Sequence, residues 1–465
     1  MENKPNIILL TVDSLRADHL GFLGYQKAVS PNIDKLAQES AVFKEAYAVG
    51  PHSPYSFPAI FTSTYPLDYK GPMDVGSSRV FLSEVLKNNG YLTATFHATV
   101  RLSSFFGYDK GWDFFYDLED PSEIGFKKKG ASGKIKKKIK TVLRSYLYRF
   151  GLIWVNIFPS TFFLSRYLIY RLTKKIKNPN VDAFTLNKAA KEFISSHNKN
   201  KNQPIFLHIH YMDVHGPFFP LDYYLKKRIL SRSEFIGKSI AAFSLNDSSF
   251  LLKRYIKDHL KKTLELYDDG IKYLDSQISD FFDFLKKENI WDNAIIIFTA
   301  DHGEELWDHG EPAHGRNLYN ELLHIPLIIK IPGKGAEIIS HKVSLRGLAP
   351  TICDLVGVGG DPAFKGKNLS KVSRKIFFHQ TAYNETKKVF KDIDIDNESQ
   401  CFLACQTNKY KYIFRGDSGK EELYDLEIDP KEKNNIADRE KAILLEMRKA
   451  IYRFKEKNPI IFHNN

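Results

Sequence analysis

The sequence predicts an α/β fold: a central, mostly parallel sheet sandwiched by helices, followed by a small C-terminal α+β subdomain. Continuous apolar runs rich in β-branched residues recur along the chain, and helical patterns lie between them. After about residue 372 the pattern changes to short strands followed by one long helix. Alternating buried strands and helices are typical of a parallel sheet covered on both faces.

The strand candidates are continuous apolar runs rather than alternating ones, as expected for strands buried on both faces. Helical periodicity separates them, with Pro and Gly near several ends. The expected strands are Asn6–Val12, Leu92–Phe96, Ile205–Ile209, Ala294–Thr299 and Pro326–Ile331. The expected helices are Asn32–Glu39, Val80–Asn88, Asn187–His197 and about Lys261–Lys287.

Three short strands and a terminal helix are expected in the C-terminal part, at Lys375–His379, Cys401–Cys405, Tyr410–Phe414 and Ala437–Lys455. Strands joined by short turns pair antiparallel, so we expect a small antiparallel sheet here. The chain is therefore divided into a catalytic α/β domain, residues 1–370, and a C-terminal subdomain, residues 371–465.

Composition places the chain among globular proteins. It has 465 residues, of which 43% are hydrophobic and 26% charged, which excludes a disordered, collagenous or coiled-coil chain. Three Cys are too few, and odd in number, for a disulfide scaffold, so a reducing compartment is favoured. The opening residues show no signal-peptide pattern, and we expect a cytoplasmic protein.

The basic charge is concentrated in one insertion, residues 121–181. From Lys127 to Val181 there are fifteen Lys or Arg and no Asp or Glu, so the rest of the chain is near neutral. Its longest uncharged run, Phe150–Ser165, is too short to span a bilayer. Basic residues mixed with aromatic ones favour peripheral contact of 127–177 with an anionic membrane on its cytoplasmic face. The alternative is an insertion packed on the protein with solvated Lys residues. No recognition motif supports nucleic-acid binding.

Polar side chains follow three of the expected strands, where ligands bind in open α/β sheets. Asp13 follows the first strand, Asp301 and His302 follow Ala294–Thr299, and Ile205–Ile209 leads to His210 and His215. Singly, an Asp after a strand is more often a helix cap. Together, two carboxylates and an imidazole suit one divalent metal ion, Mn²⁺ or Zn²⁺, with Ca²⁺ or Mg²⁺ less natural because of the nitrogen ligand.

Several segments, in order, resemble the sulfatase family of the alkaline-phosphatase superfamily. They are NIILLTVDSLRADHLGFLGY, SPNIDKLAQESAVFKEAYA, SFPAIFTSTYP, GYLTATFHATVRLSSFFGYDKGWDFF, HYMDVHGPFFP, FTADHGEELWDHGEPAHGRNLYNELLHIPLIIKIPG, LAPTICDLVGV and ELYDLEIDPKEKNNIAD. They cover nearly everything except about 121–181 and part of 221–261. The resemblance implies an alkaline-phosphatase-like fold, a divalent metal (Mn²⁺, Zn²⁺ or Ca²⁺) and hydrolysis of an anionic ester.

The resemblance implies the metal ligands and the nucleophile, which can be matched to this sequence position by position. Asp13 matches the first metal ligand, and Asp301 and His302 match the family's Asp-Asn or Asp-His pair. Many members have a second Asp where this chain has Ser14. The family's nucleophile lies nine residues before the position of Thr62, which is Ser53 in this sequence.

The nucleophile segment departs from the family pattern. Sulfatases usually have Cys-x-Pro-Ser-Arg there, with the Cys converted to formylglycine; this chain has Ser53-Pro54-Tyr55-Ser56-Phe57. The departure weighs against formylglycine, although some serine-type systems modify Ser. An unmodified hydroxyl beside such a metal is similar to the superfamily's phosphoglycerol and phosphoethanolamine transferases, which use a Thr.

Two His complete the catalytic set that the resemblance implies. His215 matches the active-site His of the Asp-x-His-x-Pro-like segment, and His314 matches a basic position near the leaving oxygen. His208 and His210 alternate on one strand, and Asp308 and His309 share a loop with His314; the sequence assigns no catalytic or metal-binding role to these four. Arg16 replaces the missing Arg as an anion clamp or lies on the surface.

Three functions remain open from the sequence. The first is a metal-dependent sulfatase-type hydrolase that cleaves a sulfuric ester or phosphoester on a glycan or lipid through Ser53. The second is a phosphoglycerol- or phosphoethanolamine-type transferase. The third is a catalytically degenerate relative that binds anionic glycans or membranes. The natural substrate and the oligomeric state do not follow from the sequence.

Overall fold

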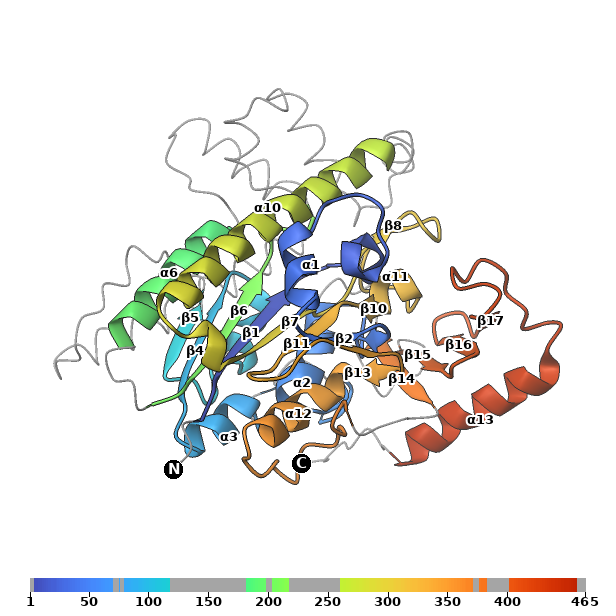
Figure 1. Ribbon diagram of the computed structural model, residues 1–465. Coiled ribbons are helices and arrows are strands. Elements are labelled where there is room, and N and C mark those ends of the chain that lie inside the picture. The colour runs from blue at the N-terminus through green and yellow to red at the C-terminus, as the bar shows by residue number, and fades with distance from the viewer. Residues whose placement is uncertain are drawn as a thin grey trace, which may run out of the picture.

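The central feature of the computed structural model is an eight-stranded sheet in the order β12-β2-β11-β7-β1-β6-β4-β5 (Figure 1). The structure describes residues 4–69, 75, 79–117, 181–197, 203–216, 260–370, 376–382 and 401–457. The strands are β1 (Asn6–Val12), β2 (Ala41–Phe43), β4 (Leu92–His97), β5 (Phe114–Asp117), β6 (Ile205–Tyr211), β7 (Ala294–Ala300), β11 (Leu327–Lys330) and β12 (Glu337–Ile339). All five expected runs are strands of this sheet.

The middle of the sheet is parallel and brings three strand ends to one level. β1 lies between β6 and β7 and runs parallel to both, and Val12 pairs with Tyr211 on one side and Ala300 on the other. β11 is antiparallel to β7 and to β2. The sheet is therefore mixed and mostly parallel, and the residues after β1 and β7 leave it side by side.

Helices cover both faces of the sheet, which confirms the predicted sandwich (Figure 1). One layer holds α1 (Pro31–Ala37), α6 (Ala183–His197) and α10 (Leu260–Lys287), in which α10 contacts the other two. The opposite layer holds α2 (Ser53–Thr62), α3 (Leu82–Asn88) and α12 (Leu348–Leu355), in which α2 contacts the other two. All ten residues of α2 are buried, so the helix that begins at Ser53 is rigidly enclosed.

Small elements surround the sheet edge where the strands end. A three-stranded sheet has the order β10 (His324–Ile325), β3 (Ala46–Tyr47) and β13 (Val343–Ser344). A two-stranded hairpin pairs β8 (Glu305–Leu306) with β9 (Pro312–Ala313), and the short helix α11 (Asn320–Leu323) follows it. The hairpin lies within the segment 301–319, and α11 follows that segment directly.

The C-terminal sheet is antiparallel, as predicted, and α13 (Lys441–Lys457) packs on it. Its strands are β14 (Phe377–Ala382), β15 (Cys401–Gln406), β16 (Tyr410–Arg415) and β17 (Glu421–Asp425). The fourth strand was not predicted because its two glutamates suggest a solvated loop. Glu422 is nevertheless buried, where it pairs with Arg415 and accepts a hydrogen bond from Tyr319.

β14 connects the C-terminal sheet to the start of α2. The Gln380 N–H donates to the Val49 carbonyl at 2.8 Å, and the Tyr55 hydroxyl donates to the Ala382 carbonyl at 3.2 Å. A Cβ at Gly50 would collide with Tyr55 and with the Gln380 carbonyl, so only glycine fits there. The loop that leads into Ser53 is therefore clamped by the C-terminal sheet.

Some predictions fall outside the described residues. The basic insertion lies there except for Val181, so the expected membrane contact through 127–177 stays a prediction, as do the cytoplasmic location and the division at residue 370. Among the described residues, we find no helix whose length and apolar character would suit a membrane crossing. All three Cys are buried free thiols.

Candidate active site

Asp13 and Asp301 meet because β1 and β7 end at the same level. The Asp13 N–H donates to the Tyr211 carbonyl at 2.9 Å, and the Asp301 N–H donates to the Val12 carbonyl at 3.2 Å. These bonds continue the ladder of the sheet by one residue beyond each strand. Both carboxyl groups are buried, so their charges need a partner.

Ser53 is the first residue of α2, and Pro54, whose fixed φ suits a first helical turn, follows it. Its Oγ lies 3.1 Å from Asp13 Oδ2, to which it donates, and 3.4 Å from His302 Nε2. The helix N-terminus also places the positive end of the helix dipole beside this oxygen. The structure thus brings the expected nucleophile into contact with two of the expected metal ligands.

The tautomer of His302 follows from its contact with Gly303. Nδ1 lies 2.7 Å from the Gly303 carbonyl oxygen, which only accepts, so Nδ1 carries the proton. The lone pair of neutral Nε2 then points toward Asp13 Oδ1 at 3.5 Å and Asp301 Oδ2 at 3.6 Å. Burial lowers the pKa of His302, which keeps this nitrogen free of a proton.

The convergence of two carboxyl groups and the Nε2 lone pair of His302 fits a divalent cation. One atom each from Asp13, Asp301 and His302 lies within 4.8 Å of the other two. Asp301 Oδ2 is buried and accepts no hydrogen bond from any described residue. Burial, together with the charge of Asp13, raises the pKa of Asp301 to about 7. A divalent cation would relieve this repulsion.

His314 and His215 lie beside this group, as the sequence predicts. The His314 ring centroid is 4.5 Å from that of His302 and 5.1 Å from that of His215. His215 Nδ1 lies 2.5 Å from the Gly216 carbonyl, so it is the donor of that bond. Although burial acts to raise it, the pKa of Asp13 is held well below its ordinary value by the charge of His215 and by its other imidazole neighbours.

Three further residues at the site were not assigned from the sequence. His52, which precedes Ser53, lies 5.3 Å from His314 between ring centroids; burial and the charge of His314 hold its pKa well below the ordinary value. Glu304 contacts His314 Nδ1 at 3.1 Å. His210 Nε2 lies 3.5 Å from Asp13 Oδ2. The sequence signal that could have identified His52 and Glu304 is their position close to Ser53 and to His302.

Arg16 is buried, and its guanidinium is occupied by protein groups. It pairs with Asp308 at 2.6 Å and Asp18 at 2.8 Å, and it donates to the Glu304 carbonyl at 3.2 Å. Of the two alternatives for Arg16, neither the anion clamp nor the surface position fits these contacts. Phe57, at the family's Arg position, packs edge-on against His210 with centroids 4.9 Å apart. Arg16 therefore braces the loop after His302.

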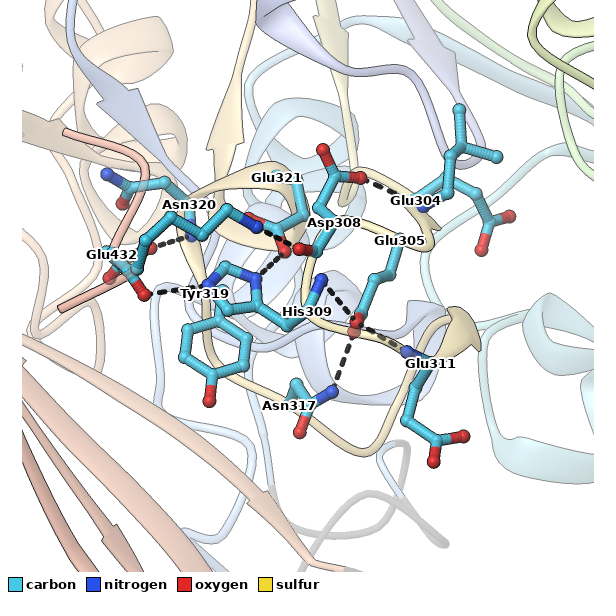
Figure 2. Close-up of polar contacts among 12 residues, drawn as sticks. Glu304, Glu305, Asp308, His309, Glu311, Asn317, Tyr319, Asn320, Glu321 and Glu432 are labelled. Carbon is cyan, nitrogen blue, oxygen red and sulfur yellow. Dashed lines mark hydrogen bonds and ion pairs between the residues drawn. The ribbon is translucent and has the colours of Figure 1, made fainter. Parts of the chain in front are cut away.

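A second group of Glu and His side chains lies on that loop (Figure 2). His309 Nδ1 contacts Glu321 Oε1 at 2.5 Å, and His309 Nε2 contacts the Glu432 carbonyl at 2.9 Å. Glu305 accepts hydrogen bonds from the His309 and Glu311 N–H groups and from Asn317. Although Glu305, His309 and Glu321 lie close enough to share a cation, both His309 nitrogens and both Glu305 oxygens already have partners. Through the contact with Glu432, this group ties the loop to the C-terminal subdomain.

Comparison with known proteins gives two overlapping family matches. The Sulfatase family model matches residues 5–358, and the model described as N-sulphoglucosamine sulphohydrolase, C-terminal, matches residues 310–457. An arylsulfatase of Clostridium perfringens is 23% identical over 94% of this chain and 91% of its own length. Iduronate 2-sulfatase of Mus musculus is 25% identical over 72% of this chain and 60% of its own length.

Solved structures share the fold over almost the whole chain. Phosphonate monoester hydrolase of Agrobacterium radiobacter has a TM-score of 0.68 at 17% identity, covering 98% of this chain and 96% of that one. A protein in complex with its substrate D-glucosamine-2-N,6-O-disulfate has a TM-score of 0.67 at 18% identity, covering 98% of each chain. With a family model that spans about three quarters of its residues, the chain belongs to the sulfatase family, whose members are sulfuric ester hydrolases.

Proposed function

We propose that this chain is a metal-dependent hydrolase that cleaves a sulfuric ester by attack of Ser53 Oγ on sulfur. The observation that carries the proposal is the position of Ser53 Oγ, 3.1 Å from Asp13 Oδ2 and 3.4 Å from His302 Nε2. Nothing in packing requires a hydroxyl at the point where proton-free metal ligands converge. A structural serine in α2 would bond a carbonyl, as Ser56 does to Gly50 at 2.7 Å.

The protein groups around Ser53 suit its activation as a nucleophile. A divalent cation held by Asp13, Asp301 and His302 would lower the pKa of the Ser53 hydroxyl and offset negative charge on the ester oxygens. Asp13 Oδ2 accepts the Ser53 hydrogen bond and thereby orients the oxygen. The N-terminus of α2 stabilises negative charge on that oxygen, and His215 and His314 border the space where an anionic ester would lie.

An anionic ester on a glycan is the proposed substrate. Two proteins with this fold support it: one is described as a 2-O GAG sulfatase, and the other is bound to D-glucosamine-2-N,6-O-disulfate as its substrate. An ester on a lipid head group is the second choice, and it depends on the predicted membrane contact through residues 127–177.

Phosphoester cleavage or transfer is the second candidate function. The observation that favours it is the residue at position 53 itself, a Ser where most sulfatases have the Cys that becomes formylglycine. A plain serine ester cannot expel sulfate unaided and needs an attacking water or alcohol. The degenerate-binder alternative is disfavoured because all six predicted site residues come together.

Replacement of Ser53 tests the nucleophile. Ser53→Ala should abolish turnover of 4-nitrophenyl sulfate and of bis(4-nitrophenyl) phosphate while the thermal unfolding temperature stays unchanged. Ser56→Ala is the matched control, because Ser56 lies on the same buried helix but bonds the Gly50 carbonyl. Full activity of Ser53→Ala would place the nucleophile elsewhere.

Mass spectrometry of the peptide that contains Ser53 separates the two chemistries. Formylglycine made from Ser is lighter by the mass of two hydrogen atoms. An unmodified Ser53 together with faster turnover of the phosphodiester would favour phosphoryl transfer, whereas formylglycine with faster turnover of the sulfate ester would support sulfatase chemistry but replace the serine hydroxyl as the nucleophile by the hydrated aldehyde.

A further inference from the structure

Glu304 fixes the orientation of the His314 ring. Its two carboxylate oxygens lie 3.1 Å and 3.3 Å from His314 Nδ1. The Glu304 side chain is only 3% exposed, so few other partners compete for this carboxylate. Because an ionised carboxylate only accepts hydrogen bonds, Nδ1 carries a proton.

The other ring nitrogen of His314, Nε2, is therefore available for proton transfer. With Nδ1 held by Glu304, Nε2 lies on the far side of the ring. The ring itself is surrounded by active-site imidazoles, with centroids 4.5 Å from His302, 5.1 Å from His215 and 5.3 Å from His52. A carboxylate that fixes one imidazole nitrogen so that the other can exchange protons is a recurrent catalytic arrangement.

We propose that Glu304 is the positioning residue of His314, the basic group that the family resemblance places near the leaving oxygen, and that this pair adapts the site to esters of poor leaving groups, such as alcohols, rather than of phenols. The inference rests on the proposed function, since it concerns the leaving group of the reaction that Ser53 begins. It goes beyond that function by naming the group that holds the proton donor and the class of alcohol released.

The proton balance of the two half-reactions follows from this arrangement. Ser53 begins and ends the cycle as the alkoxide, its hydroxyl proton having been released to solvent when the nucleophile is activated. In the first half-reaction, Ser53 Oγ bonds to sulfur, the bond from sulfur to the leaving oxygen breaks, and doubly protonated His314 gives its Nε2 proton to that oxygen. His314 is then neutral, with its remaining proton on Nδ1 beside Glu304. In the second, neutral Nε2 takes a proton from the water that attacks sulfur, the Ser53–sulfur bond breaks, hydrogen sulfate leaves and His314 regains its proton.

The need for this donor depends on the leaving group. An alkoxide is a strong base and leaves slowly unless it is protonated as its bond to sulfur breaks, whereas 4-nitrophenolate is stable without a proton. General acid catalysis contributes roughly 10²–10⁴-fold where the proton is needed. A buried carboxylate that orients His314 should therefore increase the rate of cleavage of alcohol esters and change the rate for activated aryl esters little.

The same loop provides a matched control. His309 and Glu321 also form a His–Glu contact, but Figure 2 shows that pair directed toward Glu432 of the C-terminal subdomain. Glu321→Gln alters a pair of the same chemistry without touching His314. A general effect of disturbing the loop would appear in this variant as well.

The test measures kcat/KM for 4-nitrophenyl sulfate, phenyl sulfate and an alkyl sulfate in the wild type and in Glu304→Ala, Glu304→Gln, His314→Ala and Glu321→Gln. Corresponding phosphoesters replace the sulfates if the wild type prefers them. We expect Glu304→Ala and His314→Ala to lose about 10²-fold or more with the poorer leaving groups and less than about 10-fold with 4-nitrophenyl. Glu304→Gln, which still accepts from Nδ1, should fall between, and Glu321→Gln should match the wild type. Glu304→Ala combined with His314→Ala should lose no more than His314→Ala alone, because the pair acts as one unit.

Equal losses with all leaving groups, or additive losses in the double variant, would overturn the positioning role while leaving the Ser53 proposal intact. Wild-type protein that turns over no ester in a Ser53-dependent way would overturn the proposed function and this inference together. If Glu304→Ala fails to fold, Glu304→Gln and His314→Ala still decide the question through their leaving-group dependence.

Discussion

Asp213 gives a quantitative prediction about stability and pH. It follows β6, its side chain is buried, Oδ1 accepts a hydrogen bond from the Ala183 N–H at 3.1 Å, and Oδ2 has no hydrogen-bond partner among the described residues. Burial, with a smaller contribution from the charge of Asp182, raises its pKa from 3.8 to about 7. The folded chain therefore holds this proton over a pH range in which the unfolded chain has already released it.

The sign and size of the effect follow from linkage. Because the folded-state pKa is raised, the stabilising contribution is complete below about pH 4, the unfolded value, and is lost as pH rises through about 7. A shift of about 3 pH units corresponds to about 4 kcal/mol in total, at about 1.4 kcal/mol per unit. Roughly 3 kcal/mol of this loss falls between pH 5 and pH 8.

Asp213→Asn removes the charge and keeps the carbonyl oxygen that Ala183 contacts. Urea unfolding at pH 5 and pH 8 should show that the wild type loses about 3 kcal/mol more than the variant over this range, with equal m-values. Asp417→Asn, which changes an exposed carboxyl, should follow the wild type. Parallel pH dependence of wild type and Asp213→Asn would show that this carboxyl is already ionised in the folded chain at pH 5.

Three further changes test the site and its support. Asp301→Asn should weaken Mn²⁺ or Zn²⁺ binding by at least about 10-fold in isothermal titration calorimetry, yet raise the unfolding temperature of the metal-free chain because a buried repulsion is removed. Lys411→Met leaves the Glu432 carboxylate buried without its 2.7 Å partner and should cost about 3–5 kcal/mol in urea unfolding. Gly303→Ala places a Cβ against the Glu321 carbonyl and should lower both the unfolding temperature and the metal affinity. For each variant, an unchanged value would contradict the contact on which its prediction rests.

The parallel strands were predictable because their residues are apolar on both faces. Asn6–Val12 and Ala294–Thr299 are short, continuous and rich in β-branched residues, which favours buried strands, and their ends located Asp13 and Asp301. The direction of β11 was not predictable, because an apolar run of four residues reads the same in either orientation. β17 was missed because Glu422 is buried only through a partner on another strand.

The candidate site also contains residues that the sequence alone predicts and residues that need the family resemblance or the fold. Asp13, Asp301 and His302 follow from strand ends, whereas Ser53 needed the family resemblance, since a Ser before a Pro usually indicates only a helix start. Glu304 was not recognised because its role depends on where the loop returns His314, ten residues later. Arg16 was ambiguous because its partners Asp18 and Asp308 are brought together only by the fold.

The clamp between β14 and the start of α2 has a consequence for engineering. The Gln380 N–H bond to the Val49 carbonyl and the exclusion of any side chain at Gly50 pack the C-terminal sheet directly against the start of α2, where the nucleophile lies. A shortened enzyme that stops near residue 370 would lack β14 and leave residues 49–52 and the start of α2 without these contacts. Grafting the C-terminal part of another sulfatase onto this chain would therefore require exchanging residues 49–55 along with it.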